Sequence, residues 1–292
     1  AGVATFNDIA ATSGAGQSIK LGIQVSGINH VFYSDNIFLS ANVGYQLVPD
    51  NNTAINRTAG QAQTSDYLIR LKDAYGNQTS RSSTVSILVT AVSASDGVTV
   101  QRTVGNYTIS PSSTYVIIPK SAFVVQQSGD YQFSFSSSGL VTAYTSQFTV
   151  TNATADKLVI LQNMPASVQS GITFSPAVRL QLQDAYNNPV LNSTVSVSVS
   201  AIAGSVTGIT GGVVQNTLGD SIIEFSDLAI SGISSSAQLR FTALSATGVN
   251  AKTYSSTTFR ITSGDPYQLS VSATAISVAN RTSIATFSVK VL

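Results

Sequence analysis

The chain has 292 residues, which is room for about two or three domains of ordinary size. Its 14 Lys and Arg residues nearly balance its 13 Asp and Glu residues, and the resulting net charge of +1 does not favour nucleic acid as a partner. The absence of Cys and the presence of a single His, His30, exclude disulfides, thiolate metal sites, His-based catalytic triads and multi-His metal sites.

The composition favours β-strands over helices. The chain holds 45 Ser and 31 Thr residues but only one Glu, Glu224, so strong helix formers are scarce. No apolar stretch approaches the roughly 18 residues of a membrane span, so we expect no membrane span in this segment. The opening AGVATFNDIA has neither Met nor a leader pattern, which indicates a mature or excised piece.

An internal repeat organises the sequence. The segment LIRLKDAYGN at residues 68–77 matches LQLQDAYNNP at residues 180–189, and Asp73 and Asp184 hold the same place in the two segments. One unit is therefore about 110 residues long.

Two further pairs of similar segments lie two units apart. VATFNDIA from Val3 resembles IIEFSDLA from Ile222, and YQLVPDNNTAINRT from Tyr45 resembles YQLSVSATAISVANRT from Tyr267. Both separations are about 220 residues, twice the length of one unit. Alternate units are thus more alike than neighbours, and the chain is interpreted as a window into a longer array.

In chain order, this repeat predicts two complete domains flanked by two partial ones. The predicted pieces are the C-terminal part of a unit at 1–44, a complete domain at 45–151, a second at 152–263, and the N-terminal part of a further unit at 264–292. A partial piece of two or three strands is not expected to be stable alone.

Within a unit, apolar residues recur at every second position, which is typical of strands with one buried face. The predicted core positions are Ile69, Leu71, Val85, Ile87, Val89, Tyr131, Phe133, Phe135, Phe148, Val150, Val178, Leu180, Leu182, Val195, Val197 and Val199. Turn residues separate the strands, and we expect positive φ at Gly76 and Asn187. About seven strands in 110 residues predict an all-β fold of tandem immunoglobulin-like β-sandwiches in a linear array.

The repeated pattern resembles a known class of surface protein. KLVILQNMPASVQSG, VRLQLQDAYNNPV, IIEFSDLAI and TTFRIT follow one another in the second complete unit. This succession resembles the tandem Ig-like, filamin- or invasin-type repeats of large extracellular surface or fibre proteins. The resemblance implies stalks, adhesins and fibre subunits, and it carries over no catalytic residue because its most specific motif is a turn.

Asn-x-Thr is the most informative local signal. With 17 Asn, 31 Thr and 45 Ser residues, chance predicts about two Asn-x-Thr and about three Asn-x-Ser, whereas seven and none occur. Because Thr acceptors are generally better used than Ser acceptors, we expect covalent N-glycans on a secreted chain. The alternative is that Asn suits turns and Thr suits strand ends. The expected glycosylation residues are Asn51, Asn56, Asn77, Asn106, Asn152, Asn192 and Asn280.

Cofactor, metal and catalytic sites are not expected. Each of the two turns that begin Asp-Ala-Tyr, called DAY turns below, offers one carboxylate, Asp73 or Asp184. A Ca²⁺ site usually uses several carboxylates. A glycosidase pair would need two positioned carboxylates, and the 12 Asp residues are scattered through turns. His30 lacks an acid or nucleophile at matching spacing. Exposed Tyr side chains leave a lectin-like surface as a weaker alternative.

The sequence therefore predicts a non-enzymatic, extracellular or cell-surface glycoprotein. Its main predicted role is a structural segment of a filament, appendage or surface coat, with copies of itself or adjoining repeats of the same chain as partners. The alternative is the stalk or ligand-binding region of a cell-surface adhesin, whose partners would be surface glycans or proteins. No nucleic acid partner is expected.

Overall fold

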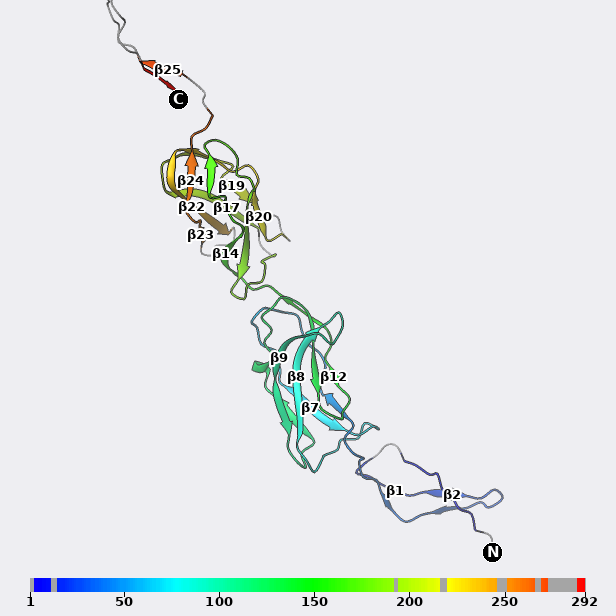
Figure 1. Cartoon of the computed structure of the whole chain (residues 1–292). Helices are drawn as coiled ribbons and strands as arrows, with labels where there is room; N and C mark the ends of the chain where they lie inside the picture. Colours follow the sequence, from blue (N-terminus) through cyan, green and yellow to red (C-terminus); the bar gives the residue numbers. More distant parts are fainter. Residues whose placement is uncertain are drawn as a thin grey trace, which may run out of the picture. The chain divides into compact units, whose positions relative to one another are not determined.

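The computed structural model describes residues 3–11, 15–191, 194–215, 220–245, 251–265, 269–272 and 288–291. The chain divides into two units, Ala1–Ala153 and Thr154–Leu292, each with its own core (Figure 1). The described regular structure is all β apart from one 3₁₀ turn at Lys120–Ala122, which confirms the predicted class. The finer boundaries at 44/45 and 263/264 stay predictions.

The first unit contains thirteen of the strands. They are β1 (Ser18–Ile19), β2 (Gly22–Gln24), β3 (Val31–Tyr33), β4 (Ile37–Phe38), β5 (Gln46–Pro49), β6 (Arg57–Thr58), β7 (Tyr67–Lys72), β8 (Val85–Ser93), β9 (Val100–Ile109), β10 (Tyr115–Ile118), β11 (Gly129–Ser136), β12 (Ala143–Tyr144) and β13 (Phe148–Thr151). β1 pairs with β4 and β2 with β3, outside the main sheets.

The main body of this unit is a sandwich of two sheets. One sheet has the order β10-β7-β5, and the other has the order β6-β13-β11-β8-β9 with β12 added beside β11. The rings of Tyr67 on β7 and Phe135 on β11 lie 5.7 Å apart between their centroids, so the two sheets face each other across the core. This is the architecture of an immunoglobulin-like sandwich.

The second unit repeats this architecture. Its described strands are β14 (Ala155–Gln162), β15 (Ser167–Gln169), β16 (Val178–Asp184), β17 (Val195–Ala203), β18 (Val206–Thr210), β19 (Val213–Gln215), β20 (Ile222–Phe225), β21 (Ala229–Gly232), β22 (Ser234–Ser245), β23 (Lys252–Ser255), β24 (Phe259–Thr262), β25 (Leu269–Ser272) and β26 (Ser288–Val291). One sheet is β14-β16-β20, the other is β15-β24-β22-β17-β19 with β23 beside β22, and β18 pairs with β21. Each unit has one parallel pair at the equivalent place, β6–β13 in the first unit and β15–β24 in the second.

The period-two pattern places the core as predicted, with one exception. Ile69, Leu71, Leu180 and their predicted partners are buried. Val199 packs against the core but is only half-buried, because it lies at the edge of the core and the four residues of β17 that follow it are exposed. The strands also outnumber the expected seven per domain: nine form β5–β13, and eleven described ones form β14–β24. The excess comes from short edge strands and from the added pair β18–β21.

Candidate functional site

Five of the seven predicted glycan acceptors lie in the described part of the chain. Asn192 and Asn280 fall outside it. The side chains of Asn51, Asn56 and Asn106 are exposed, and in the described part of the chain their amide nitrogens make no hydrogen bond. A sugar bonded to any of these three nitrogens would meet solvent.

Asn51 lies in a turn and Asn106 lies on a strand. The backbone N–H of Thr53 donates to Asn51 Oδ1 at 2.9 Å, which is the hydrogen bond of an Asx turn. Asn106 lies on β9, the edge strand of its sheet, and is paired with Leu88. A glycan at Asn106 would therefore stand beside an otherwise open sheet edge.

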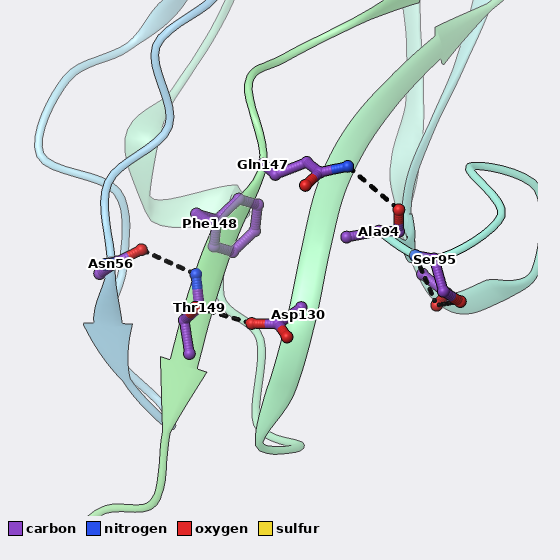
Figure 2. A pocket seen from close by; sticks show the side chains of 8 residues that line it. Asn56, Ala94, Ser95, Asp130, Gln147, Phe148 and Thr149 are labelled. Atoms are coloured by element: carbon purple, nitrogen blue, oxygen red, sulfur yellow. Dashed lines mark hydrogen bonds between the residues drawn. The ribbon is translucent and has the colours of Figure 1, made fainter.

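The Asn56 amide is held by a hydrogen bond from a residue far along the chain. The backbone N–H of Thr149 on β13 donates to Asn56 Oδ1 at 2.8 Å, and the hydroxyl of Thr149 donates to Asp130 Oδ1 on β11 at 2.6 Å (Figure 2). The oxygen of the amide is thus fixed while its nitrogen stays free. Figure 2 shows this group at one side of a hollow that reaches across to Gln147 and Ser95. The hollow is open to solvent and has a volume of about 570 Å³.

The middle residue of the Asn56 sequon points the opposite way. Arg57 is 7 % exposed, its guanidinium lies 4.4 Å from the ring centroid of Phe148, and its Nη1 donates to the carbonyl of Phe123 at 3.0 Å. Burial lowers the pKa of the Arg57 guanidinium. Since successive side chains of a strand point to opposite faces, the buried Arg57 directs Asn56 outward.

Asn77 and Asn152 differ from the exposed three. Asn77 Nδ2 donates to Asp73 Oδ2 at 3.0 Å, and Asn188 Nδ2 donates to Asp184 Oδ2 at 2.9 Å in the equivalent turn, although Asn188 belongs to no sequon. The side-chain amide of Asn77 therefore helps to close the turn, independently of any glycan. Asn152 is 6 % exposed, and its Nδ2 donates to the carbonyl of Ala153 at 3.0 Å.

The repeated DAY turns are closed by their aspartates. Asp184 Oδ1 accepts the backbone N–H groups of Tyr186 and Asn188, both at 2.9 Å. Asp73 accepts the corresponding bonds from Tyr75 and Asn77 at 2.9 and 2.8 Å. The predicted positive φ is confirmed, at +86° for Gly76 and +70° for Asn187.

These carboxylates bind N–H donors and are not grouped as metal ligands would be. Within the described ranges, no three His, Asp or Glu side chains are grouped so that they could hold a metal ion. His30 is exposed and packs edge-on against Phe32, with 5.0 Å between ring centroids.

Acid is expected to weaken the first unit through Asp73. Burial raises the pKa of Asp73, but N–H donors from Asn42, Asn77 and Tyr75 outweigh it, so the pKa lies below its ordinary value. The stability that this depressed pKa gives is present above the unfolded pKa of about 3.9 and is lost as pH falls through the folded pKa. Urea midpoints of the first unit should therefore fall below about pH 4, and Asp73→Asn should flatten that dependence. An unchanged slope in D73N would contradict this assignment.

Sequence reasoning missed the residues that orient Asn56. Thr149 and Asp130 lie far from it along the chain, on β13 and β11, and no local pattern links them. A second missed set did leave a signal: Ser34, Thr145 and Ser256 recur at intervals of one repeat unit and make matching hydrogen bonds.

Comparisons with known proteins give structural neighbours only. No family model and no curated protein matches the sequence. Among solved structures, the chain is similar to FdeC, a broadly conserved Escherichia coli adhesin, with 16 % identity and a TM-score of 0.36 over 80 % of this chain and 70 % of that one. It is also similar to the BSP domain of a biofilm associated protein, with 11 % identity and a TM-score of 0.19 over 75 % of this chain and 30 % of that one.

A glycosidase is among these neighbours too. A β-glycosidase from Bacteroides vulgatus matches with 10 % identity and a TM-score of 0.24 over 73 % of this chain and 24 % of that one. Because these TM-scores are all below 0.5, none of the three similarities bears on function. In the part of the chain that the structure describes, no helix is long and apolar enough to cross a membrane.

Proposed function

We propose that this chain is a structural, N-glycosylated segment of an extracellular filament, appendage or surface coat built from repeated immunoglobulin-like domains. The proposal is supported most by one combination: two sandwiches with the same strand order, and exposed sequon amides on the first of them. Copies of the chain or adjoining repeats are its proposed partners.

Repeated sandwiches suit a role in spanning distance. Contacts in such arrays are mainly between nearest neighbours, so adding units adds length. With charged residues at only 9 %, the sheet edges carry few of the charges that commonly prevent edge-to-edge pairing. Glycans at Asn51, Asn56 and Asn106 would supply bulk and hydration in their place.

Glycopeptide mass spectrometry of native material tests the glycan part. We expect hexose-containing modification at Asn51, Asn56 and Asn106, whose amide nitrogens are free, and lower or no occupancy at Asn77 and Asn152, whose nitrogens are hydrogen-bonded. The last two residues are the internal control, because they occur in the same sequon type. Unmodified peptides for all three exposed residues would refute the proposal.

Electron microscopy of the native source material tests the filament part. β8 and β9 have nine and ten residues, and at about 3.3 Å per residue such strands with their connecting turns make a sandwich roughly 30 to 40 Å long. A continuous thread with lateral contacts and an axial repeat of about 60 to 80 Å for two units is the expected result. Separate rods anchored at one end would instead favour an adhesin stalk.

A further inference from the structure

The same hairpin occurs three times in the described chain, each time closed by a side-chain hydroxyl. The backbone N–H groups of Leu21, Phe133 and Leu239 donate to the hydroxyls of Ser34, Thr145 and Ser256 at 3.0, 2.9 and 3.0 Å. Each hydroxyl in turn donates to the carbonyl of the next residue, at 2.8, 2.9 and 2.8 Å. We call this element the hydroxyl-closed hairpin.

The strand register of the three hairpins is also the same. In each hairpin, the residue two positions before the N–H donor pairs with the residue three positions after the hydroxyl. These pairs are Ile19 with Ile37, Tyr131 with Phe148, and Ala237 with Phe259. Residues 18–38 therefore have the backbone pairing of the last hairpin of a sandwich.

In the two sandwiches, a further strand covers the other edge of this hairpin. β8 pairs with β11, placing Val89 opposite Phe135, and β17 pairs with β22, placing Val199 opposite Phe241. The N-terminal copy consists of β1 and β2 paired with β4 and β3 (Figure 1, blue). Its other edge carries no strand among the described residues.

Among the described residues, no strand pairs with this edge and no second sheet pairs its strands as a facing layer, and the equivalents of two core positions are exposed. Ile23 occupies the place of Phe135 and Phe241, which are fully buried, yet it is 43 % exposed. Ile37 occupies the place of Phe148 and is 39 % exposed, against 2 % for Phe148. The hairpin thus presents an apolar face and an unpaired edge. In the first sandwich the equivalent Phe135 packs on Tyr67 of the facing sheet and lies beside Val89 of β8.

We propose that the free edge of Ser18–Gln24 is a docking site for one extended strand of the β8/β17 type, supplied by the first half of a further repeat of this kind. The strand would place alternating β-branched side chains on the apolar face, with the equivalent of Val199 opposite Ile23. This choice of partner names the strand type that the proposed array would supply, and it rests on the repeat architecture of the proposed function.

The C-terminal strands β25 and β26 of a second copy are not strands of the β8/β17 type. β25 pairs with β26 so that Leu269 lies opposite Val291, as Leu47 lies opposite Leu71 in β5–β7. β5 and β7 belong to the sheet that faces the hydroxyl-closed hairpin, not to the one that contains it. A β8/β17-type strand is therefore required in addition.

A cysteine register scan on the full chain tests the proposal, because the chain contains no Cys. The probe is a synthetic peptide of residues 194–203, with cysteine replacing Val199 or its neighbours Ser198 and Ser200. With Ile23→Cys in the full chain and oxidised glutathione as the oxidant, which is reduced to two glutathione thiols, we expect the Val199→Cys peptide to form a mixed disulfide about tenfold faster than the other two. The reason is that a shift of one residue turns the thiol to the opposite face. The matched control is Gln24→Cys, which should prefer the Ser198→Cys peptide.

Three results would overturn the proposal. The first is that all three peptides react with Ile23→Cys at equal rates. The second is that Gln24→Cys does not change the preferred peptide from Val199→Cys to Ser198→Cys. The third is that Ile23→Cys forms a disulfide-linked dimer of the full chain in preference to the peptide adduct. The last result would identify a second copy as the occupant. All substitutions lie at exposed positions outside the two cores, so folding of both units, checked by circular dichroism, should be unaffected. Failure of the glycan prediction would leave this register test intact.

Discussion

Asp184→Ala is expected to lower the free energy of unfolding of the second unit by about 3 kcal/mol. Asp184 is fully buried, and its carboxylate accepts the backbone N–H groups of Tyr186 and Asn188 together with the side-chain amide of Asn188. Alanine would leave the buried donors of Asn188 and the part-buried N–H of Tyr186 without that acceptor. A hydrogen bond to a charged group contributes more than a neutral one. Hydrogen exchange followed by mass spectrometry along a urea series would measure the effect on peptides of each unit separately.

Asp227→Ala is the matched control for this substitution. Asp227 lies in the same unit but is exposed, and its carboxylate has no hydrogen bond in the part of the chain that the structure describes. Its replacement should change the free energy of unfolding by no more than about 0.5 kcal/mol. If Asp184→Ala behaved like Asp227→Ala, the turn would not depend on its carboxylate.

Phe133→Ala is expected to cost the first unit about 3 to 5 kcal/mol. Phe133 is fully buried, and its ring centroid lies 4.9 Å from the centroids of both Phe123 and Phe148 and 6.3 Å from that of Tyr67. The guanidinium of Arg57 lies 5.5 Å from the same ring. Truncation therefore removes packing from four neighbours at once and leaves a cavity that fixed β-strands cannot close.

Phe133→Leu separates the loss of volume from the loss of aromatic contacts. It keeps most of the apolar volume, and we expect a cost of about 1.5 kcal/mol. Thermal unfolding followed by near-ultraviolet circular dichroism, which reports the Tyr and Phe environment, would rank the two variants. Equal losses for Leu and Ala would mean that cavity volume does not set the cost at this position.

Much of the fold could be predicted because it is written in short-range patterns. Alternation of apolar and polar residues identified the buried faces of β7 and β16, and the turn residues predicted the positive φ of Gly76 and Asn187. These features depend on residues only a few positions apart. Alternation does not reveal where a strand leaves the core, so it did not separate the half-buried Val199 from the fully buried Val197.

The candidate site was less predictable because it depends on distant pairing. A sequon pattern alone does not separate Asn56, whose oxygen is fixed by Thr149, from Asn77, whose nitrogen closes a turn. Comparison of the two turns offered a hint, since Asn188 occupies the same place as Asn77 without being followed by the sequon threonine. The orientation of the Asn56 amide follows only from the register of β6 against β13.

The parallel strand pairs have a mechanical consequence. β6 lies near the start of its sandwich and β13 at its end, and they run side by side in the same direction, as β15 and β24 do. A pull on the two ends of one sandwich therefore drags these strands past each other. Their hydrogen bonds, such as those from Ala59 N–H to the Thr151 carbonyl at 2.8 Å and from Ser170 N–H to the Thr262 carbonyl at 3.0 Å, are then strained together in shear. Hydrogen bonds that are loaded together must break together. Each sandwich therefore needs a larger force to unfold than one whose terminal strands separate one hydrogen bond at a time.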